Sequence, residues 1–180
     1  MIIRTALLAA CAIALSACYT SDALLLDSSA GVQPLPDGVY SNGTGDFHRL
    51  TRSSDGWYMD QVKTNDAKDF GTSDRLLLIS IGTQDGKPLY AFARDDKEIG
   101  YIYGVVEVDD GRFYRALPDC SDEKDRAVAV ANGGLYKTGD DESGICSFTS
   151  ASGLISALRA YVAGGGASTD FAQPFQRTGD

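Results

Sequence analysis

Two cysteines in the second half of the chain, Cys120 and Cys146, offer the chemistry that is easiest to assign. They lie 26 positions apart, without C-x-x-C spacing, and the whole chain contains one histidine. This spacing and composition favour a structural disulfide over a redox or zinc-binding pair. A disulfide indicates an oxidising compartment outside the cytoplasm.

The single histidine, His48, could act as the base of a hydrolytic site. Such sites use a histidine held by a carboxylate and a nearby nucleophile, but the sequence has no G-x-S-x-G motif. We therefore expect His48 to be a surface or hydrogen-bonded histidine on a strand. An envelope hydrolase that uses His48 or clustered carboxylates remains the alternative.

The densest group of carboxylates is Asp140, Asp141 and Glu142. Calcium takes six to eight oxygen ligands, which this acidic turn could supply in part, but the calcium-loop pattern D-x-[DN]-x-[DN]-G is absent. We keep these three residues as weak calcium candidates. Phosphate-binding glycine loops, H-E-x-x-H and dinucleotide fingerprints are also absent from the sequence, so no cofactor is predicted.

The N-terminus carries a targeting signal. Arg4 precedes an apolar run that ends in Leu15-Ser16-Ala17-Cys18, and this run is shorter than the roughly 20 residues that span a bilayer. The four residues resemble the lipobox of bacterial lipoproteins. The resemblance covers residues 1–18 only, and we recognise no functional family for the rest of the chain.

The lipobox resemblance implies that residues 1–17 are removed as a signal peptide and that Cys18 carries a diacylglycerol thioether, usually with acylation of the new amino terminus. In the enterobacterial sorting rule, Asp after the lipidated cysteine retains a lipoprotein in the inner membrane. Tyr19 stands at that position, which favours the outer membrane, on its periplasmic face or at the surface. Two or three acyl chains make a lasting anchor, whereas one binds reversibly.

Ordinary signal-peptidase cleavage after Ala14 is the rival interpretation, because Ala12 and Ala14 satisfy its small-residue pattern. That cut would leave Cys18 as an odd thiol if Cys120 and Cys146 form a disulfide, since Cys11 leaves with the signal. Lipidation of Cys18 accounts for the odd cysteine, so we favour the lipoprotein interpretation.

Composition limits the partners of the mature protein. Removing residues 1–17 from the 180-residue chain leaves 163 residues, and loss of Arg4 changes the formal charge from −9 to −10. Such an acidic protein is repelled by nucleic-acid phosphates and by anionic head groups. We expect no nucleic-acid binding, and we expect membrane association through the lipid anchor alone.

The pattern of apolar residues predicts an α+β fold. Strands joined by turns are expected from residue 38 to residue 117, including a hairpin at Asp110-Gly111. Helices are expected after Ser121 and across Leu154–Val162, the second capped near Ser150. We predict an antiparallel sheet of about six or seven strands, possibly a half-barrel, with two short helices and one disulfide.

Domain boundaries follow from the same reading. We expect a signal peptide at 1–17, a lipidated tether at 18–36, one α+β domain at 37–163 and a disordered tail at 164–180. The apolar patch Leu24-Leu25-Leu26 in the tether is expected to tuck against the domain or to enter the lipid interface, and we slightly favour the domain.

The function expected from these features is that of a lipid-anchored envelope protein that presents a small disulfide-bonded domain for binding or structural interaction, with an envelope protein as its candidate partner. Catalysis is not the favoured interpretation, and the sequence does not decide it. A periplasmic inhibitor or chaperone is a further alternative.

Overall fold

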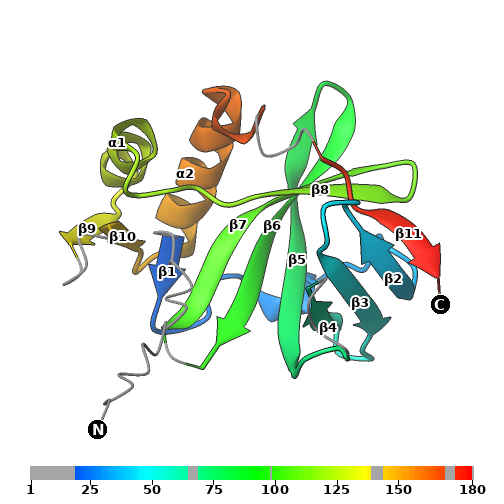
Figure 1. Cartoon of the computed structure of the whole chain (residues 1–180). Helices are drawn as coiled ribbons and strands as arrows, with labels where there is room; N and C mark the ends of the chain where they lie inside the picture. Colours follow the sequence, from blue (N-terminus) through cyan, green and yellow to red (C-terminus); the bar gives the residue numbers. More distant parts are fainter. Residues whose placement is uncertain (1–18, 65–68, 98, 139–143, 169–172, 180) are drawn as a thin grey trace, which may run out of the picture.

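The residues that the structure describes form one open sheet of eleven strands, with two α-helices against one of its faces (Figure 1). This computed structural model describes residues 19–64, 69–97, 99–138, 144–168 and 173–179. The strands are β1 (Tyr19–Ser21), β2 (Gly38–Ser41), β3 (Phe47–Arg52), β4 (Trp57–Lys63), β5 (Ser73–Gln84), β6 (Lys87–Asp96), β7 (Gly100–Asp109), β8 (Arg112–Ala116), β9 (Leu135–Thr138), β10 (Gly144–Ser147) and β11 (Gln176–Gly179). The helices are α1 (Glu123–Ala131) and α2 (Ala151–Ala163), with short 3-10 turns η1 (Ser28–Ala30) and η2 (Gly166–Ser168).

The sheet forks at β7. The strand order is β11-β2-β3-β4-β5-β6-β7-β1-β10-β9, and β8 also pairs with β7. The first half of β7 pairs with β1 and the second half with β8. All pairs are antiparallel except the parallel pair of β1 and β10.

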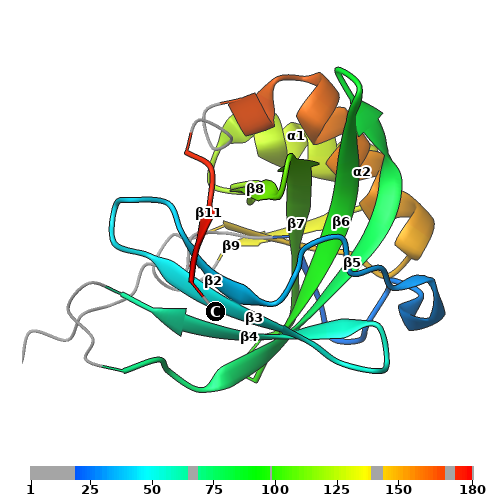
Figure 2. The same ribbon diagram turned by 90° about the vertical axis from the view of Figure 1, so that its right-hand side faces the viewer.

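The sheet curls strongly without its strand ladder closing (Figure 2). The curl brings β8 close to the segment before β11, where Phe113 and Phe175 form an isolated antiparallel bridge. Two backbone hydrogen bonds of 3.1 and 2.7 Å join these two residues. The concave side of the sheet is therefore partly enclosed.

Both faces of β5 are buried at Leu77, Leu78 and Ile79, which explains why apolar residues follow one another without alternation there. Alternate residues of a strand point to opposite faces, and here each face packs into its own core. One core lies under α2, whereas the other fills the concave side and contains Leu35, Tyr40, Leu50, Tyr58, Leu78, Phe92, Val106, Phe113 and Phe175. Neither helix in the described part of the chain is long and apolar enough to cross a membrane.

The predicted α+β class is confirmed, but the predicted six or seven strands are too few. The excess comes largely from short strands: β1 has three residues, and β2, β9, β10 and β11 have four each. Such segments are too short to show an alternating pattern, and they are strands because neighbouring strands pair with them.

The hairpin predicted at Asp110-Gly111 joins β7 to β8, as expected. Both turn residues have positive φ, 49° at Asp110 and 73° at Gly111. Asp85-Gly86 repeats this arrangement between β5 and β6, with φ values of 49° and 82°. Two-residue turns of this kind match the right-handed twist of the flanking strands, and Asp-Gly tolerates the conformation they need.

The segment expected as a tether, 18–36, packs on the domain over its described residues. β1 is buried along its whole length, and Leu26 and Leu35 are 3% and 1% exposed. Leu24 and Leu25 pack against the core beneath α2, so the apolar patch tucks against the domain. Burial of these apolar side chains holds the segment in place.

The segment expected as a disordered tail, 164–180, also differs from expectation where it is described. Ala167 and Phe175 are buried, and β11 pairs with β2. The side chains of β11 are all exposed, so its sequence lacks the apolar alternation by which a strand is recognised. Backbone pairing of β11 and the burial of Phe175 hold residues 175–179 against the domain.

α2 should contribute strongly to stability through its buried face. Leu158 is fully buried, and we expect Leu158→Ala to lower the free energy of unfolding by about 2–5 kcal/mol, because it leaves a cavity. Leu135→Ala is the matched control, because Leu135 is 59% exposed and such surface changes stay within about 0.5 kcal/mol. Urea denaturation of both variants measures the difference, and equal losses would contradict this assignment of the core.

Candidate functional site

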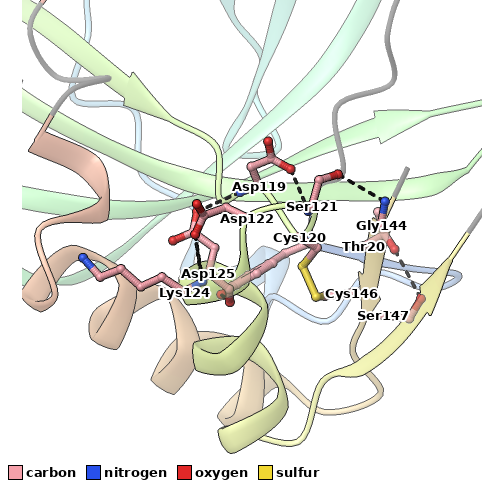
Figure 3. Close-up of a disulfide and its surroundings, with 11 residues drawn as sticks. Thr20, Asp119, Cys120, Ser121, Asp122, Lys124, Asp125, Gly144, Cys146 and Ser147 are labelled. Carbon is pink, nitrogen blue, oxygen red and sulfur yellow. Dashed lines mark hydrogen bonds between the residues drawn. A yellow bond between two sulfur atoms is a disulfide. The ribbon is translucent and has the colours of Figure 1, made fainter. Parts of the chain in front are cut away.

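The disulfide between Cys120 and Cys146 confirms the pairing predicted from the sequence. The two Cα atoms are 5.9 Å apart, and both residues are fully buried. Cys120 lies in the segment before α1, and Cys146 lies in β10 (Figure 3). The bridge therefore ties the entry to the first helix to a strand beside β1.

The segment before α1 is fixed by its own side chains as well as by the disulfide (Figure 3). The Asp119 carboxylate accepts a hydrogen bond from the Ser121 amide at 2.8 Å, and the Ser121 hydroxyl accepts one from the Gly144 amide at 3.2 Å. Asp122 caps α1 by accepting from the amides of Lys124 and Asp125. The two bonds to Asp122 satisfy backbone donors that would otherwise lack partners at the start of α1.

Asp125 is a buried carboxyl in the first turn of α1. It accepts a hydrogen bond from the Asp119 amide at 2.9 Å. Burial raises the pKa of Asp125, and the nearby acidic Asp122 adds to the increase. The Asp125 backbone carbonyl accepts a hydrogen bond from the Tyr19 hydroxyl at 3.0 Å, so this turn also contacts the start of the described chain.

β1 is held from both sides. Tyr19 is in register with Tyr103 of β7 and with Cys146 of β10. Its ring is fully buried and packs on Phe148 with a centroid distance of 5.1 Å. Burial raises the pKa of the Tyr19 hydroxyl. Tyr19, the residue after the expected lipidation site, is thus part of the core.

The concave side of the sheet brings His48 of β3 together with Asp60 of β4. His48 Nδ1 lies 2.9 Å from each carboxylate oxygen of Asp60, and each side chain is 3% exposed. The rings of Phe113 and Phe175 meet the imidazole edge to face, at 6.3 and 5.0 Å. A polar pair is therefore enclosed in an apolar core.

A small cavity borders this pair. Its lining is mostly apolar and includes His48, Asp60, Arg94 and Arg115 as polar residues. The space open to water is about 20 Å³, which is room for about one water molecule. The Arg94 Nε atom is buried and has no hydrogen-bond partner among the described residues. A water molecule in this cavity would lie among mostly apolar side chains, beside the few polar residues of the lining.

His48 thus has the carboxylate partner of a hydrolytic site, but its surroundings are those of a packed core. Of the described residues that line the cavity, none is serine, threonine or cysteine. Within the described ranges, no three His, Cys, Asp or Glu side chains are grouped so that they could hold a metal ion. The calcium candidates Asp140, Asp141 and Glu142 lie outside the described residues.

Sequence reasoning missed Asp60, Arg94 and the structural role of Tyr19. His48 and Leu50 are two residues apart on β3, and Tyr58 and Asp60 are two residues apart on β4. Strand alternation could therefore have placed both members of each pair on the same inward face. Leu50 is in register with Asp60 across the hairpin, so the carboxylate lies diagonally from the imidazole. No comparable alternation in the sequence indicates that residues 19–21 form a strand.

Comparison of the chain with models of known protein families, with curated proteins and with solved structures found no match.

The disulfide should stabilise the oxidised protein. Because it closes a 26-residue separation, the loop-entropy model gives about 3.5 kcal/mol, and we expect reduction to lower the free energy of unfolding by about this amount. Denaturant titration with and without reductant measures the change. The double variant Cys120→Ala/Cys146→Ala is the control and should not respond to reductant. An unchanged wild-type midpoint on reduction would contradict the prediction.

The His48–Asp60 pair should be important for stability because both groups are closed from solvent. Asp60→Ala leaves a buried imidazole nitrogen without its hydrogen-bond partner, and we expect a loss of about 1–3 kcal/mol in unfolding free energy. Asp69→Ala removes a carboxylate from an exposed position and should change stability by less than about 0.5 kcal/mol. Thermal and urea unfolding measure both. An Asp60→Ala protein as stable as the Asp69→Ala protein would show that the pair is not structural.

Proposed function

We propose that this protein is a lipid-anchored component of a bacterial cell envelope that presents a disulfide-bonded β domain for binding, without catalysis. The proposal starts from Leu15-Ser16-Ala17-Cys18, with lipid on Cys18 and residues 1–17 removed. Tyr19 after the modified cysteine favours the outer membrane.

One observation carries the anchor proposal: Cys120 and Cys146 bond to each other. Neither is therefore available to pair with Cys18, and Cys11 belongs to the segment expected to leave. In an oxidising compartment, an exported protein with one remaining thiol is exposed to unwanted coupling and oxidation. A thioether at Cys18 removes that thiol.

The binding role is supported by the surroundings of the groups that could do chemistry. His48 and Asp60 bond to each other between aromatic rings, and the adjoining cavity has room for about one water molecule. A hydrolase needs an open site that places a nucleophile beside the base.

Replacing the proposed lipid attachment site tests the anchor. We expect Cys18→Ser to abolish incorporation of labelled fatty acid and to block cleavage before residue 18, because the serine hydroxyl cannot form the thioether. Metabolic labelling, membrane fractionation and mass spectrometry of the N-terminal peptide measure these changes. In the wild-type protein, the labelled form should fractionate with the outer membrane.

The matched control is Cys11→Ser, which changes a cysteine inside the expected signal. This variant should be labelled, cleaved and anchored like the wild-type protein. A Cys18→Ser protein that keeps its label, or a wild-type mature peptide that starts at Leu15, would reject the anchor proposal. Recovery with the inner membrane would reject only the proposed sorting.

A further inference from the structure

No residue separates the proposed lipid attachment site from the folded domain. Cys18 is bonded to Tyr19, and consecutive Cα atoms in a chain are 3.8 Å apart. Tyr19 is fully buried and already belongs to β1. The lipid would therefore be attached within one residue of a fixed point in the sheet.

β1 cannot serve as a spacer without leaving the sheet. Its three residues pair with β7, and two of them also pair with β10. Two side-chain hydrogen bonds add to these ladders: the Tyr19 hydroxyl donates to the Asp125 carbonyl at 3.0 Å, and the hydroxyls of Ser21 and Tyr103 are 2.8 Å apart. Extending this segment would break all these contacts together.

Resting on the proposed anchor, we propose that the domain stands directly on the bilayer, with the surface around the start of β1 in contact with lipid head groups. Acyl chains bury themselves in the hydrocarbon region, and only the glycerol, its thioether and Cys18 itself link them to Tyr19. A hydrated gap of several residues' length cannot form between the domain and the membrane. The anchor therefore also orients the domain.

The charge of the protein surface near β1 indicates which lipid head groups it would contact. Cys146 is in register with Tyr19, and the disulfide joins Cys146 to the segment before α1. That segment carries the acidic residues Asp119 and Asp122, and α1 begins with the exposed Glu123. The exposed Lys124 beside them offsets one of these negative charges. Acidic groups at a bilayer are repelled by anionic lipids within a Debye length. The surface therefore fits zwitterionic head groups.

Two exposed positions provide a near and a far probe of this contact. Ser121 is exposed, and its hydroxyl accepts from the amide of Gly144 at the start of β10. Thr51 is exposed on β3, which lies five steps from β1 in the strand order. Neighbouring strands are about 4.8 Å apart, so the far probe is about 24 Å away along the sheet.

The test measures the distance of these probes from the membrane. Lipidated full-length mature protein with Ser121→Cys or Thr51→Cys is labelled with a fluorophore. It is then bound to vesicles of phosphatidylcholine and phosphatidylethanolamine that contain a head-group quencher. We expect quenching at least twofold stronger at position 121 than at position 51, and weaker quenching at 121 on phosphatidylglycerol vesicles at low salt.

A flexible insertion is the matched control. Eight Gly/Ser residues between Cys18 and Tyr19 have a root-mean-square span of about 16 Å, so they should lift the domain and remove most of the difference between the two probes. Equal quenching at both positions without the insertion, or unchanged quenching with it, would overturn direct contact. Strong quenching on anionic vesicles alone would overturn the proposed head-group preference.

Failure of the anchor itself gives a different result. Unlipidated protein would not sediment with the vesicles, and mass spectrometry of the same sample would show no added hydrocarbon at Cys18. Hydrogen exchange of the Tyr19–Ser21 amides shows whether β1 stays in the sheet at the membrane. Rapid exchange on vesicles but slow exchange in detergent would show that β1 leaves the sheet at the membrane, which also overturns the proposal.

Discussion

The two-sided pairing of β1 is the interaction on which the arrangement of the domain depends. β1 connects β7, in the long curled part of the sheet, with β10 and its hairpin partner β9. Without it, the β9–β10 hairpin would have no hydrogen-bonded neighbour in the described sheet. The bond from the Tyr19 hydroxyl to the Asp125 carbonyl extends this connection to α1. A three-residue strand thus fixes the position of a helix and a hairpin relative to the main sheet.

The elements that could be predicted are those whose sequence pattern agrees with their environment. α2 has an apolar stripe of buried residues, and Ser150 caps it by accepting from the Gly153 amide. The Asp-Gly turns appear where alternating apolar runs meet, because the turn residues and the strands favour the same geometry. The disulfide could be predicted because only Cys120 and Cys146 are left to pair once Cys11 leaves with the expected signal and Cys18 is taken as lipidated. These features need no knowledge of distant contacts.

The elements that could not be predicted depend on contacts far apart in the chain. Tyr19-Thr20-Ser21 becomes a strand because residues about 80 and 127 positions later lie on either side of it. β11 has exposed side chains and is ordered by pairing with β2 and by the burial of Phe175. The His48–Asp60 pair could be predicted only in part. Alternation assigns both residues to inward faces, whereas only the curl of the sheet encloses them with Phe113 and Phe175.

With the proposed lipid on Cys18, the position of the disulfide affects how the domain resists a pull on its anchor. A pull on lipid at Cys18 would reach β1 first, and a three-residue strand resists little by itself. Because Tyr19 pairs on both sides, the pull must open two ladders at once. Cys146 is the residue in register with Tyr19 on β10, and its disulfide holds β10 to the segment before α1 even when that ladder opens. The disulfide therefore lies at the residue paired with Tyr19, which is where the pull would first act. If the hydrogen bonds there were lost, the disulfide would still join the β9–β10 hairpin to the segment before α1.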